Sequence, residues 1–206
     1  MTTSKAVGET INLGIKANGN VTIEGIKEAP ETGDKFFVYT LTSQTITIRG
    51  DVTTLDCSNN QLTSLDVSKN TALTTLWCSD NQLTSLDVSK NPALTQLYCY
   101  SNQLTSLNVS GCTALIALGC SSNLLRQLNV AGCTNLYSLN CAKNQIKGAE
   151  MVNLVNSLPD RQGAEEGFFF VFEEVDYGAV DGNVCLAAHV ASAKAKNWRV
   201  QVSTPE

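Results

Sequence analysis

The chain has 206 residues, of which 43% are hydrophobic and 16% are charged, and its formal net charge is −5. This length suits one or two ordinary domains. No apolar run approaches the roughly 20 residues of a membrane-spanning helix, so membrane insertion is not expected. The negative charge and the lack of a basic stripe exclude a nucleic-acid-binding surface, because such a surface must neutralise phosphates.

Residues 1–50 are rich in β-forming residues and carry no regular repeat. Residues 11–15 and 21–23 are separated by Asn18-Gly19, a dipeptide typical of a tight hairpin turn. Residues 36–41 and 46–48 continue as strands. We predict that this segment is a β-rich N-terminal cap, which covers the end of the segment that follows.

A repeat of 21 residues fills residues 51–146. The copy that begins at residue 76 reads LWCSDNQLTSLDVSKNPALTQ. An earlier, degenerate copy is expected, because Ile46 and Val52 precede Val67 and Leu73 by one period. One fixed period over successive copies indicates a solenoid in which every repeat forms one coil. The repeat is marked by five leucines: Leu55, Leu76, Leu97, Leu118 and Leu139.

Each repeat consists of two similar halves. The first half follows the pattern L-x-x-L-x-C-x-x-N-x-L, which matches the leucine-rich repeat and its period of roughly 20 to 29 residues. Parallel strands of successive coils would stack about 4.8 Å apart, so that inward leucines form a core that no single repeat could bury. We call the strand-bearing faces of the two halves the first wall and the second wall, and we expect short strands on both. The bend after the first strand carries an asparagine whose amide can bond the backbone: Asn60, Asn81, Asn102, Asn123 and Asn144.

Five cysteines occupy one position of the repeat, the second inward site of the first strand. We interpret them as small apolar side chains that fill a narrow core, in preference to a metal ladder or a redox relay, because zinc requires four convergent ligands. Disulfides are not expected, because Cβ atoms about 4.8 Å apart exceed the roughly 3.8 Å that a bridge prefers. These residues form the cysteine ladder: Cys57, Cys78, Cys99, Cys120 and Cys141.

Three further cysteines lie outside this position. Cys112 and Cys133 replace the asparagine of the second half, a substitution that leucine-rich repeats accept. Cys185 and His189, the only histidine, share a face of a predicted helix. A catalytic or metal-binding pair is the alternative for these two, but no third partner is evident, so we predict neither a metal site nor a cofactor.

Residues 147–206 are predicted to form an α/β C-terminal cap. Met151, Leu154, Val155 and Leu158 recur at helical spacing before Pro159. An apolar strand at residues 168–172, a helix at 184–196 and a strand at 198–202 follow. Strand–helix–strand order implies parallel pairing, which extends the sheet of the solenoid. We expect the strand at 168–172 to be buried on both faces, and an exposed partner-binding patch is the alternative.

The unit LDCSNNQLTSLDVSKN at residues 55–70, with its copies to about residue 146, resembles the cysteine-containing 21-residue leucine-rich repeats of internalin J-like and Bacteroidetes surface proteins. This resemblance implies an α/β fold: a right-handed leucine-rich-repeat solenoid with parallel strands. It also implies an extracellular or cell-surface recognition protein of a bacterium. Residues 1–5 lack the apolar core of a secretory signal, so either the protein stays inside the cell or, as the resemblance favours, its leader is absent from this chain.

The outward positions of the first wall vary from coil to coil, whereas those of the second wall are monotonous. Aromatic residues that the scaffold does not need suggest recognition of a partner, although they could simply shield the sheet. We expect the rings of Trp77 and Tyr98 to stack. Asp66 and Asp87 on the second wall could suggest calcium, but we interpret them as a solvated polar ladder, because calcium takes six to eight oxygens. The predicted ligand-binding residues are Asp56, Trp77, Gln96, Tyr98, Tyr100 and Asn140.

The sequence therefore predicts a non-enzymatic binding module, expected to be monomeric, with a protein or a glycan as its ligand. A structural spacer that self-assembles is the alternative, which light scattering over a range of concentrations would test. An enzyme is disfavoured, because the roughly 60 residues after the repeats are few for a catalytic domain.

Overall fold

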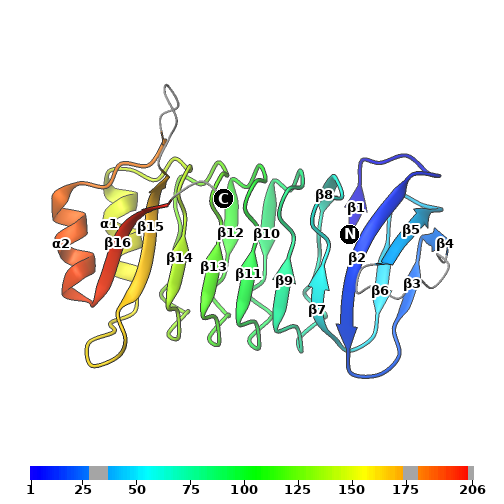
Figure 1. The fold of residues 1–206 in the computed structure, drawn as a ribbon, viewed down its shortest axis with the longest axis horizontal. Coiled ribbons are helices and arrows are strands. Elements are labelled where there is room, and N and C mark those ends of the chain that lie inside the picture. The colour runs from blue at the N-terminus through cyan, green and yellow to red at the C-terminus, as the bar shows by residue number, and fades with distance from the viewer. Residues whose placement is uncertain (28–36, 174–180, 204–206) are drawn as a thin grey trace.

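The computed structural model describes residues 1–27, 37–173 and 181–203. Figure 1 shows a long row of strands, with the helices at one end and antiparallel strands at the other. Successive coils place parallel strands side by side on the first wall, in the register that the repeat predicts. The first-wall strands of the repeats are β7 (Val52–Asp56), β9 (Thr75–Trp77), β11 (Gln96–Tyr98), β13 (Ala117–Gly119) and β14 (Ser138–Asn140).

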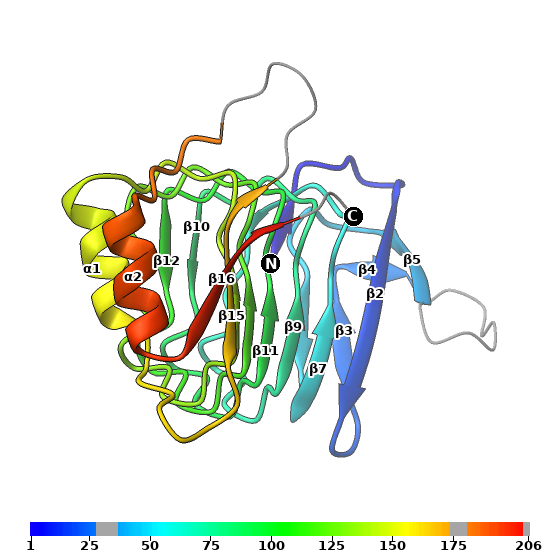
Figure 2. The same cartoon turned by 60° about the vertical axis from the view of Figure 1, so that its left-hand side comes forward.

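The second wall carries fewer strands than the first. A parallel pair, β10 (Ser85–Asp87) and β12 (Ser106–Asn108), forms a separate sheet. Figure 2 shows this pair on the opposite side of the coils from β9 and β11. The buried side chains of the core come from both halves of each coil. The prediction of strands on both walls is therefore confirmed for these coils.

The core consists of columns of identical or similar side chains, one from each coil. The repeat leucines of the first wall are at most 5% exposed, and the five ladder cysteines are fully buried. Burial of these columns removes apolar surface from water, which is the main source of stability. Three further buried columns are Leu73, Leu94, Leu115 and Leu136; Leu62, Leu83, Leu104, Leu125 and Ile146; and Val67, Val88, Val109 and Val130.

The asparagine of each first-wall bend bonds the coil before it. The amide nitrogen of Asn123 donates to the carbonyl oxygens of Cys99, Cys120 and Ser121, at 3.0 to 3.1 Å. Its amide oxygen accepts the N–H of Leu104 at 2.9 Å. We call this set the asparagine ladder. Equivalent bonds are made by Asn81, Asn102 and Asn144.

The residue before each of these asparagines adopts a left-handed backbone conformation, as Asp80 does with φ of 54° and Ser122 with φ of 52°. This conformation turns the chain sharply between the walls and is costly for most residues other than glycine, asparagine and aspartate. The amide bonds of the following asparagine therefore stabilise a bend that the backbone would otherwise avoid.

The N-terminal cap continues the sheet in antiparallel fashion. β2 (Thr10–Ala17) pairs with β7 on one edge and with β5 (Phe37–Leu41) on the other, and β4 (Ile26–Lys27) pairs with β5. Asn60 joins the cap to the first coil, because its side chain donates to the Asn12 carbonyl at 2.6 Å and accepts the Asn12 N–H at 2.9 Å. β1 (Thr2–Thr3) pairs with β8 (Leu62–Ser64).

The predicted hairpin around Asn18-Gly19 is wrong. β3 (Thr22–Glu24) pairs with β6 (Thr47–Arg49) in a separate sheet and not with β2. Both edges of β2 are already occupied by β7 and β5, so the turn carries the chain away from that sheet. The strand predicted at residues 36–41 corresponds to β5, except that Phe36 lies outside the described residues.

The C-terminal cap adds two helices and two strands. α1 (Ala149–Ser157), β15 (Gly167–Glu173), α2 (Ala187–Ala195) and β16 (Trp198–Ser203) follow in chain order. β15 and β16 pair in parallel beyond β14, which confirms the predicted extension of the sheet. The complete order of the long sheet is β16-β15-β14-β13-β11-β9-β7-β2-β5-β4.

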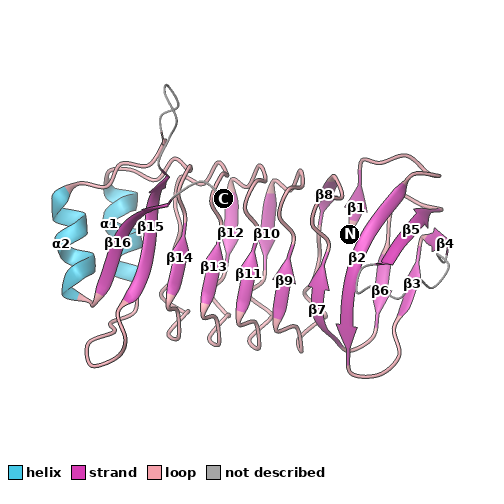
Figure 3. Cartoon of the chain, in the orientation of Figure 1, coloured by secondary structure: helices cyan, strands magenta, loops and turns pink. Residues whose placement is uncertain are grey.

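The two helices pack against each other, and α2 packs against β16. The Lys196 ammonium donates to the carbonyl oxygens of Asn156 and Leu158 at the end of α1, at 2.6 and 2.8 Å. A cation at this position complements the negative end of the helix dipole. Figure 3 shows that helix occurs at this end of the solenoid, where it closes the core.

Two predictions for this cap need correction. α2 begins at Ala187 and not at Val184, because Asn183 acts as a further member of the asparagine ladder and holds the chain extended. Its amide donates to Cys141 and Val171 at 2.8 and 2.9 Å. The strand at residues 168–172 is not buried on both faces either: its inward side chains are buried, whereas Phe168 and Phe170 are partly exposed.

Replacing Asn123 by alanine should lower the free energy of unfolding by about 3 kcal/mol, because several buried backbone groups lose their partners. Equilibrium unfolding in urea would measure this loss. Asn108→Ala is the matched control: Asn108 is exposed, accepts the N–H of Ser110 and bonds the exposed carboxylate of Asp87, so its loss should cost less than about 1 kcal/mol. Equal effects of the two variants would contradict the role assigned to the ladder.

Candidate functional site

The strand register aligns the outward side chains of the first wall into two parallel rows. Asp56, Trp77 and Tyr98 are paired across neighbouring strands, and the pairing continues through the C-terminal cap. We call the first row the outer row and the second the flanking row. The outer row is Asp56, Trp77, Tyr98, Gly119, Asn140, Phe170 and Gln201, and the flanking row is Thr54, Thr75, Gln96, Ala117, Ser138, Phe168 and Arg199.

The structure places all six predicted ligand-binding residues on the first wall. Four of them, Asp56, Trp77, Tyr98 and Asn140, lie on the outer row and span four strand steps, or about 19 Å. Gln96 lies on the flanking row and is exposed. Tyr100 follows the end of β11 and is partly exposed. Their involvement in binding remains a prediction.

The ring of Tyr98 lies toward Gly119. A Cβ atom built on Gly119 would lie 2.8 Å from Cδ1 of Tyr98, so the ring occupies the space of the missing side chain. The ring contacts of the described residues do not include a Trp77–Tyr98 pair, although the two residues are neighbours in register. The prediction that these two rings stack is therefore wrong. The Tyr98 ring packs over Gly119 on the next strand instead.

Two polar residues of the outer row, Asp56 and Asn140, bond the backbone where their strands end. Oδ1 of Asp56 accepts the N–H of Ser58 at 3.0 Å, and Oδ1 of Asn140 accepts the N–H of Ala142 at 3.2 Å. These bonds fix both side chains relative to the sheet. A fixed side chain loses less rotamer entropy on binding, which favours recognition.

A second group of aromatic side chains extends the first wall at its C-terminal end. The ring centroids of Tyr137 and Phe168 are 5.4 Å apart in an edge arrangement. Those of Phe168 and Phe170 are 6.3 Å apart, and the two ring planes are nearly parallel, at 16°. Phe168 and Phe170 are not among the predicted site residues, because the sequence predicts a strand that is buried on both faces. All five residues from Phe168 to Phe172 are apolar, so the sequence carries no alternation that could have shown which of them face outward.

Two arginines support this aromatic group. The guanidinium of Arg199 lies 5.7 Å from the ring centroid of Phe168 and pairs with the Glu166 carboxylate through Nε at 2.7 Å. Arg161 lies 5.1 Å from the centroid of Tyr137 and donates to the Leu136 carbonyl at 3.0 Å. Both guanidiniums are therefore engaged with the protein, and their role is to hold the rings in place.

On the second wall, the aspartates bond their own strand ends. Oδ1 of Asp66 accepts the N–H of Ser68, and Oδ1 of Asp87 accepts the N–H of Ser89, each at 2.9 Å. Hydrogen bonds from Ser68 lower the pKa of Asp66, and those from Ser89 lower the pKa of Asp87. Among the described residues, no cluster of three or more histidine, cysteine, aspartate or glutamate side chains has a metal-binding arrangement. This geometry agrees with a polar ladder that ends the strands.

The cysteine ladder has the chemistry of a core and not of a reactive site. All eight cysteines are free thiols, and the five ladder members are buried. Burial raises the pKa of Cys120 to about 12 and raises the pKa of Cys99 well above its usual value. A thiol of this kind stays protonated at neutral pH, whereas the thiolate is the metal ligand and the nucleophile.

Cys112 and Cys133 take over the bond of the asparagine they replace. The thiol of Cys112 donates to the Val88 carbonyl at 3.1 Å, and that of Cys133 donates to the Val109 carbonyl at 3.5 Å. Asn91 makes the corresponding bond to Val67 at 3.0 Å. These contacts agree with the predicted substitution.

Cys185 and His189 do not share a helix face, because Cys185 precedes α2. Nδ1 of His189 instead accepts the N–H of Leu186 at 3.0 Å, across the first turn of the helix. This bond satisfies one of the free N–H groups at the start of the helix. The histidine thus has a structural partner, and the prediction that it shares a helix face with Cys185 is wrong.

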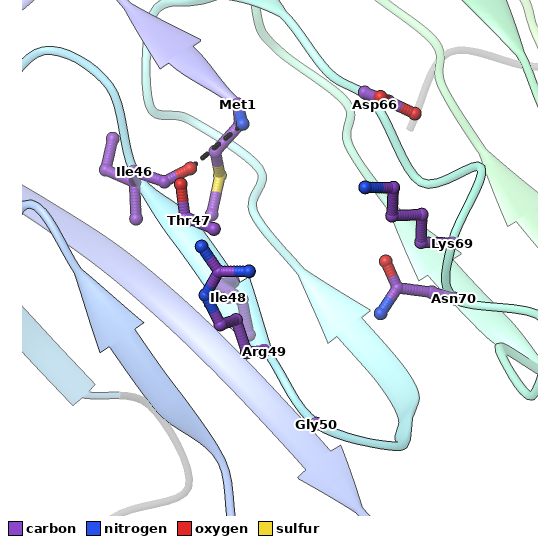
Figure 4. A pocket seen from close by; sticks show the side chains of 9 residues that line it. All are labelled: Met1, Ile46, Thr47, Ile48, Arg49, Gly50, Asp66, Lys69 and Asn70. Carbon is purple, nitrogen blue, oxygen red and sulfur yellow. Dashed lines mark hydrogen bonds between the residues drawn. The ribbon is translucent and has the colours of Figure 1, made fainter.

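A cleft of about 490 Å³ lies between β6 and the first coil, remote from the outer row. Figure 4 shows Met1 and Arg49 on one side of this cleft, with Asp66 and Lys69 on the other. The ammonium of Met1 donates to the Ile46 carbonyl at 3.0 Å, and burial lowers its pKa. Arg49 pairs with Glu24 at 3.1 Å. Two charged groups of the cleft, the Met1 ammonium and the Arg49 guanidinium, thus already have internal partners.

A regular stack of 21-residue coils with inward leucines, a cysteine ladder and an asparagine ladder defines a leucine-rich-repeat solenoid. Residues 52–91 and 71–112 match the family "Leucine Rich repeats (2 copies)". Among curated proteins, none matches the chain. Leucine-rich-repeat domains are in general binding modules without catalytic activity.

The solved functional domain of InlJ from Listeria monocytogenes, which includes a cysteine ladder, is similar to this chain. The identity is 31%, the TM-score is 0.52, and the match covers 74% of this chain. The chain spans 30% of the InlJ chain. The protein is thus a leucine-rich-repeat protein that resembles InlJ, which confirms the resemblance drawn from its repeats.

The buried thiols make the stability of the protein sensitive to alkaline pH. Their pKa is raised in the folded state, so the unfolded chain loses these protons first as the pH rises above about 9. Each thiol then lowers the free energy of unfolding by about 1.4 kcal/mol per pH unit until the pH reaches its folded pKa. The urea midpoint, measured under reducing conditions, should therefore be lower at pH 10 than at pH 8.

Cys120→Ala removes one titrating thiol, so the decrease between these pH values should be smaller than in the unmodified protein. A decrease of the same size in the variant would contradict this origin of the pH dependence.

Proposed function

We propose that the protein is a non-enzymatic binding module that recognises a protein or a glycan through the first wall, and that it acts at the surface of a bacterium or outside it. The contrast between its walls is the observation that carries this proposal. The outer row presents Trp77, Tyr98 and Phe170, whereas the corresponding positions of the second wall are serine, aspartate and asparagine. Aromatic side chains dominate recognition surfaces because they bury a large area at a small entropic cost.

The core supports a scaffold without catalytic groups. Its cysteines are protonated, and His189 bonds the start of α2. Neither helix among the described residues has the length and hydrophobicity of a membrane-spanning segment. The resemblance to InlJ supports a surface location, and this chain spans 30% of the solved InlJ chain.

Combined replacement of Trp77, Tyr98 and Tyr100 by alanine should abolish ligand binding, because these partly exposed rings provide the apolar contact area of the first wall. The thermal melt should stay unchanged, since the core columns remain intact. An array of glycans and host proteins would identify ligands, and the variant would then be compared with the unmodified protein.

The matched control replaces Ser64, Ser85 and Ser106, the exposed serines of the second wall, by alanine. This variant should bind as the unmodified protein does. Full binding by the aromatic variant would show that the first wall is not the site.

Self-assembly is the second candidate function, and the edge of the long sheet supports it. β16 forms one end of the sheet, and an edge strand offers backbone groups to another chain. Light scattering over a range of concentrations should give the mass of a monomer if ligand binding is the main activity. A mass that grows with concentration would favour assembly instead.

A further inference from the structure

We propose that the outer row binds a neutral, extended glycan that lies across the strands, with Trp77 and Tyr98 contacting one part of it and Phe170 another. This inference rests on the proposed function, because it assigns a ligand class to the same wall. It also adds the C-terminal aromatic group to the site.

The charge of the first wall suits a neutral ligand. Asp56, at one end, carries the only charge among the seven residues of the outer row. On the flanking row, the charge of Arg199 is paired with Glu166. A partner rich in charge would find little complementary charge on this surface and would still lose its hydration.

The row contains both aromatic rings and amides. Tyr98, Phe170 and Trp77 present ring surfaces, while Asn140 and Gln201 present amide groups between and beyond them. A sugar ring has an apolar face of C–H groups and a rim of hydroxyls, so it can stack on an aromatic ring while its hydroxyls bond amides. The row thus provides both kinds of contact along one line.

The spacing of the strands suits a polymer. Successive members of the row are one strand step apart, or about 4.8 Å, which is close to the length of one hexose unit in an extended glycan. Tyr98 and Phe170 are three steps apart, or about 14 Å. A chain of several sugars would therefore reach both rings at once, whereas a disaccharide would reach one of them.

Gly119 positions the ring of Tyr98 in this site. A methyl group at this position would lie 2.8 Å from the Tyr98 ring, so it must displace the ring. The ring is part of a side chain that can rotate, and the core beneath it is untouched. Gly119→Ala should therefore move the Tyr98 ring without unfolding the protein. This variant tests whether binding depends on where the ring lies, because the ring itself is still present.

The test uses the whole chain in native gels that contain galactomannan, xyloglucan, mixed-linkage β-glucan or α-mannan, with polygalacturonate as the anionic comparison. At least one neutral polymer should retard the protein. Calorimetry with the disaccharide and the hexasaccharide of that polymer follows. The hexasaccharide affinity should fall about tenfold in Tyr98→Ala, in Gly119→Ala and in Phe170→Ala.

Disaccharide affinity should fall in either Tyr98→Ala or Phe170→Ala, but not in both, because a short ligand contacts one ring. Ser106→Ala, on the second wall, is the control and should bind as the unmodified protein does. Thermal melts identify any variant that fails to fold, and Gln201→Ala then replaces Phe170→Ala as the test of the C-terminal part of the row.

Retardation by polygalacturonate alone, or by none of the polymers, would overturn the proposal. So would a hexasaccharide affinity that is unchanged in both ring variants. If host proteins bind instead and the triple aromatic variant loses them, the first wall is a protein-binding site: the proposed function then stands and the glycan assignment is wrong.

Discussion

The bonds of the asparagine ladder are the interaction on which the rest of the structure depends. Each of these side chains donates to carbonyls in its own coil and in the preceding one, and its oxygen accepts a backbone N–H of the preceding coil. The bend it stabilises contains a residue with positive φ. Without these bonds, buried backbone groups would remain unpaired, at a cost of about 1 to 3 kcal/mol each. The register of the outward rows follows from this fixed stacking of coils.

The second wall shows why cysteine can replace asparagine there. Asn91 donates to two carbonyls, but its amide oxygen is buried without a hydrogen-bond partner. A cysteine thiol at the same position, as in Cys112, donates one hydrogen bond and has no second polar group to satisfy. The substitution therefore replaces the stronger hydrogen bonds of the asparagine amide by one weaker thiol bond. In return, it removes the cost of burying an amide oxygen without a partner.

The repeat predicted the coil with accuracy because every inward position recurs in the sequence. Leu76, Cys78 and Asn81 have counterparts in each neighbouring coil, so that one unit determines the contacts of the next. The outward aromatic residues of the repeats could be located for the same reason. The ligand of these residues could not be predicted, because the repeat pattern reflects packing inside the solenoid and not the molecule that it binds.

The caps were harder to predict, because their contacts depend on residues far apart in the chain. The pairing of β2 with β7 and β5 depends on which strand edges are free, and no local turn signal reports that. The position of Phe170 beside Asn140 depends on a register between strands separated by a helix. Asn183 fixes the start of α2 through bonds to residues on β15 and in the last coil.

The identical spacing of inward residues also has an evolutionary consequence. Loss or duplication of one 21-residue unit joins leucine to leucine and cysteine to cysteine, so the coil number can change without a mismatch inside the core. Each such event shortens or lengthens the outward surface by one strand. Recombination between repeats can thus alter the footprint of this protein in discrete steps, while point mutations outside the core adjust its chemistry.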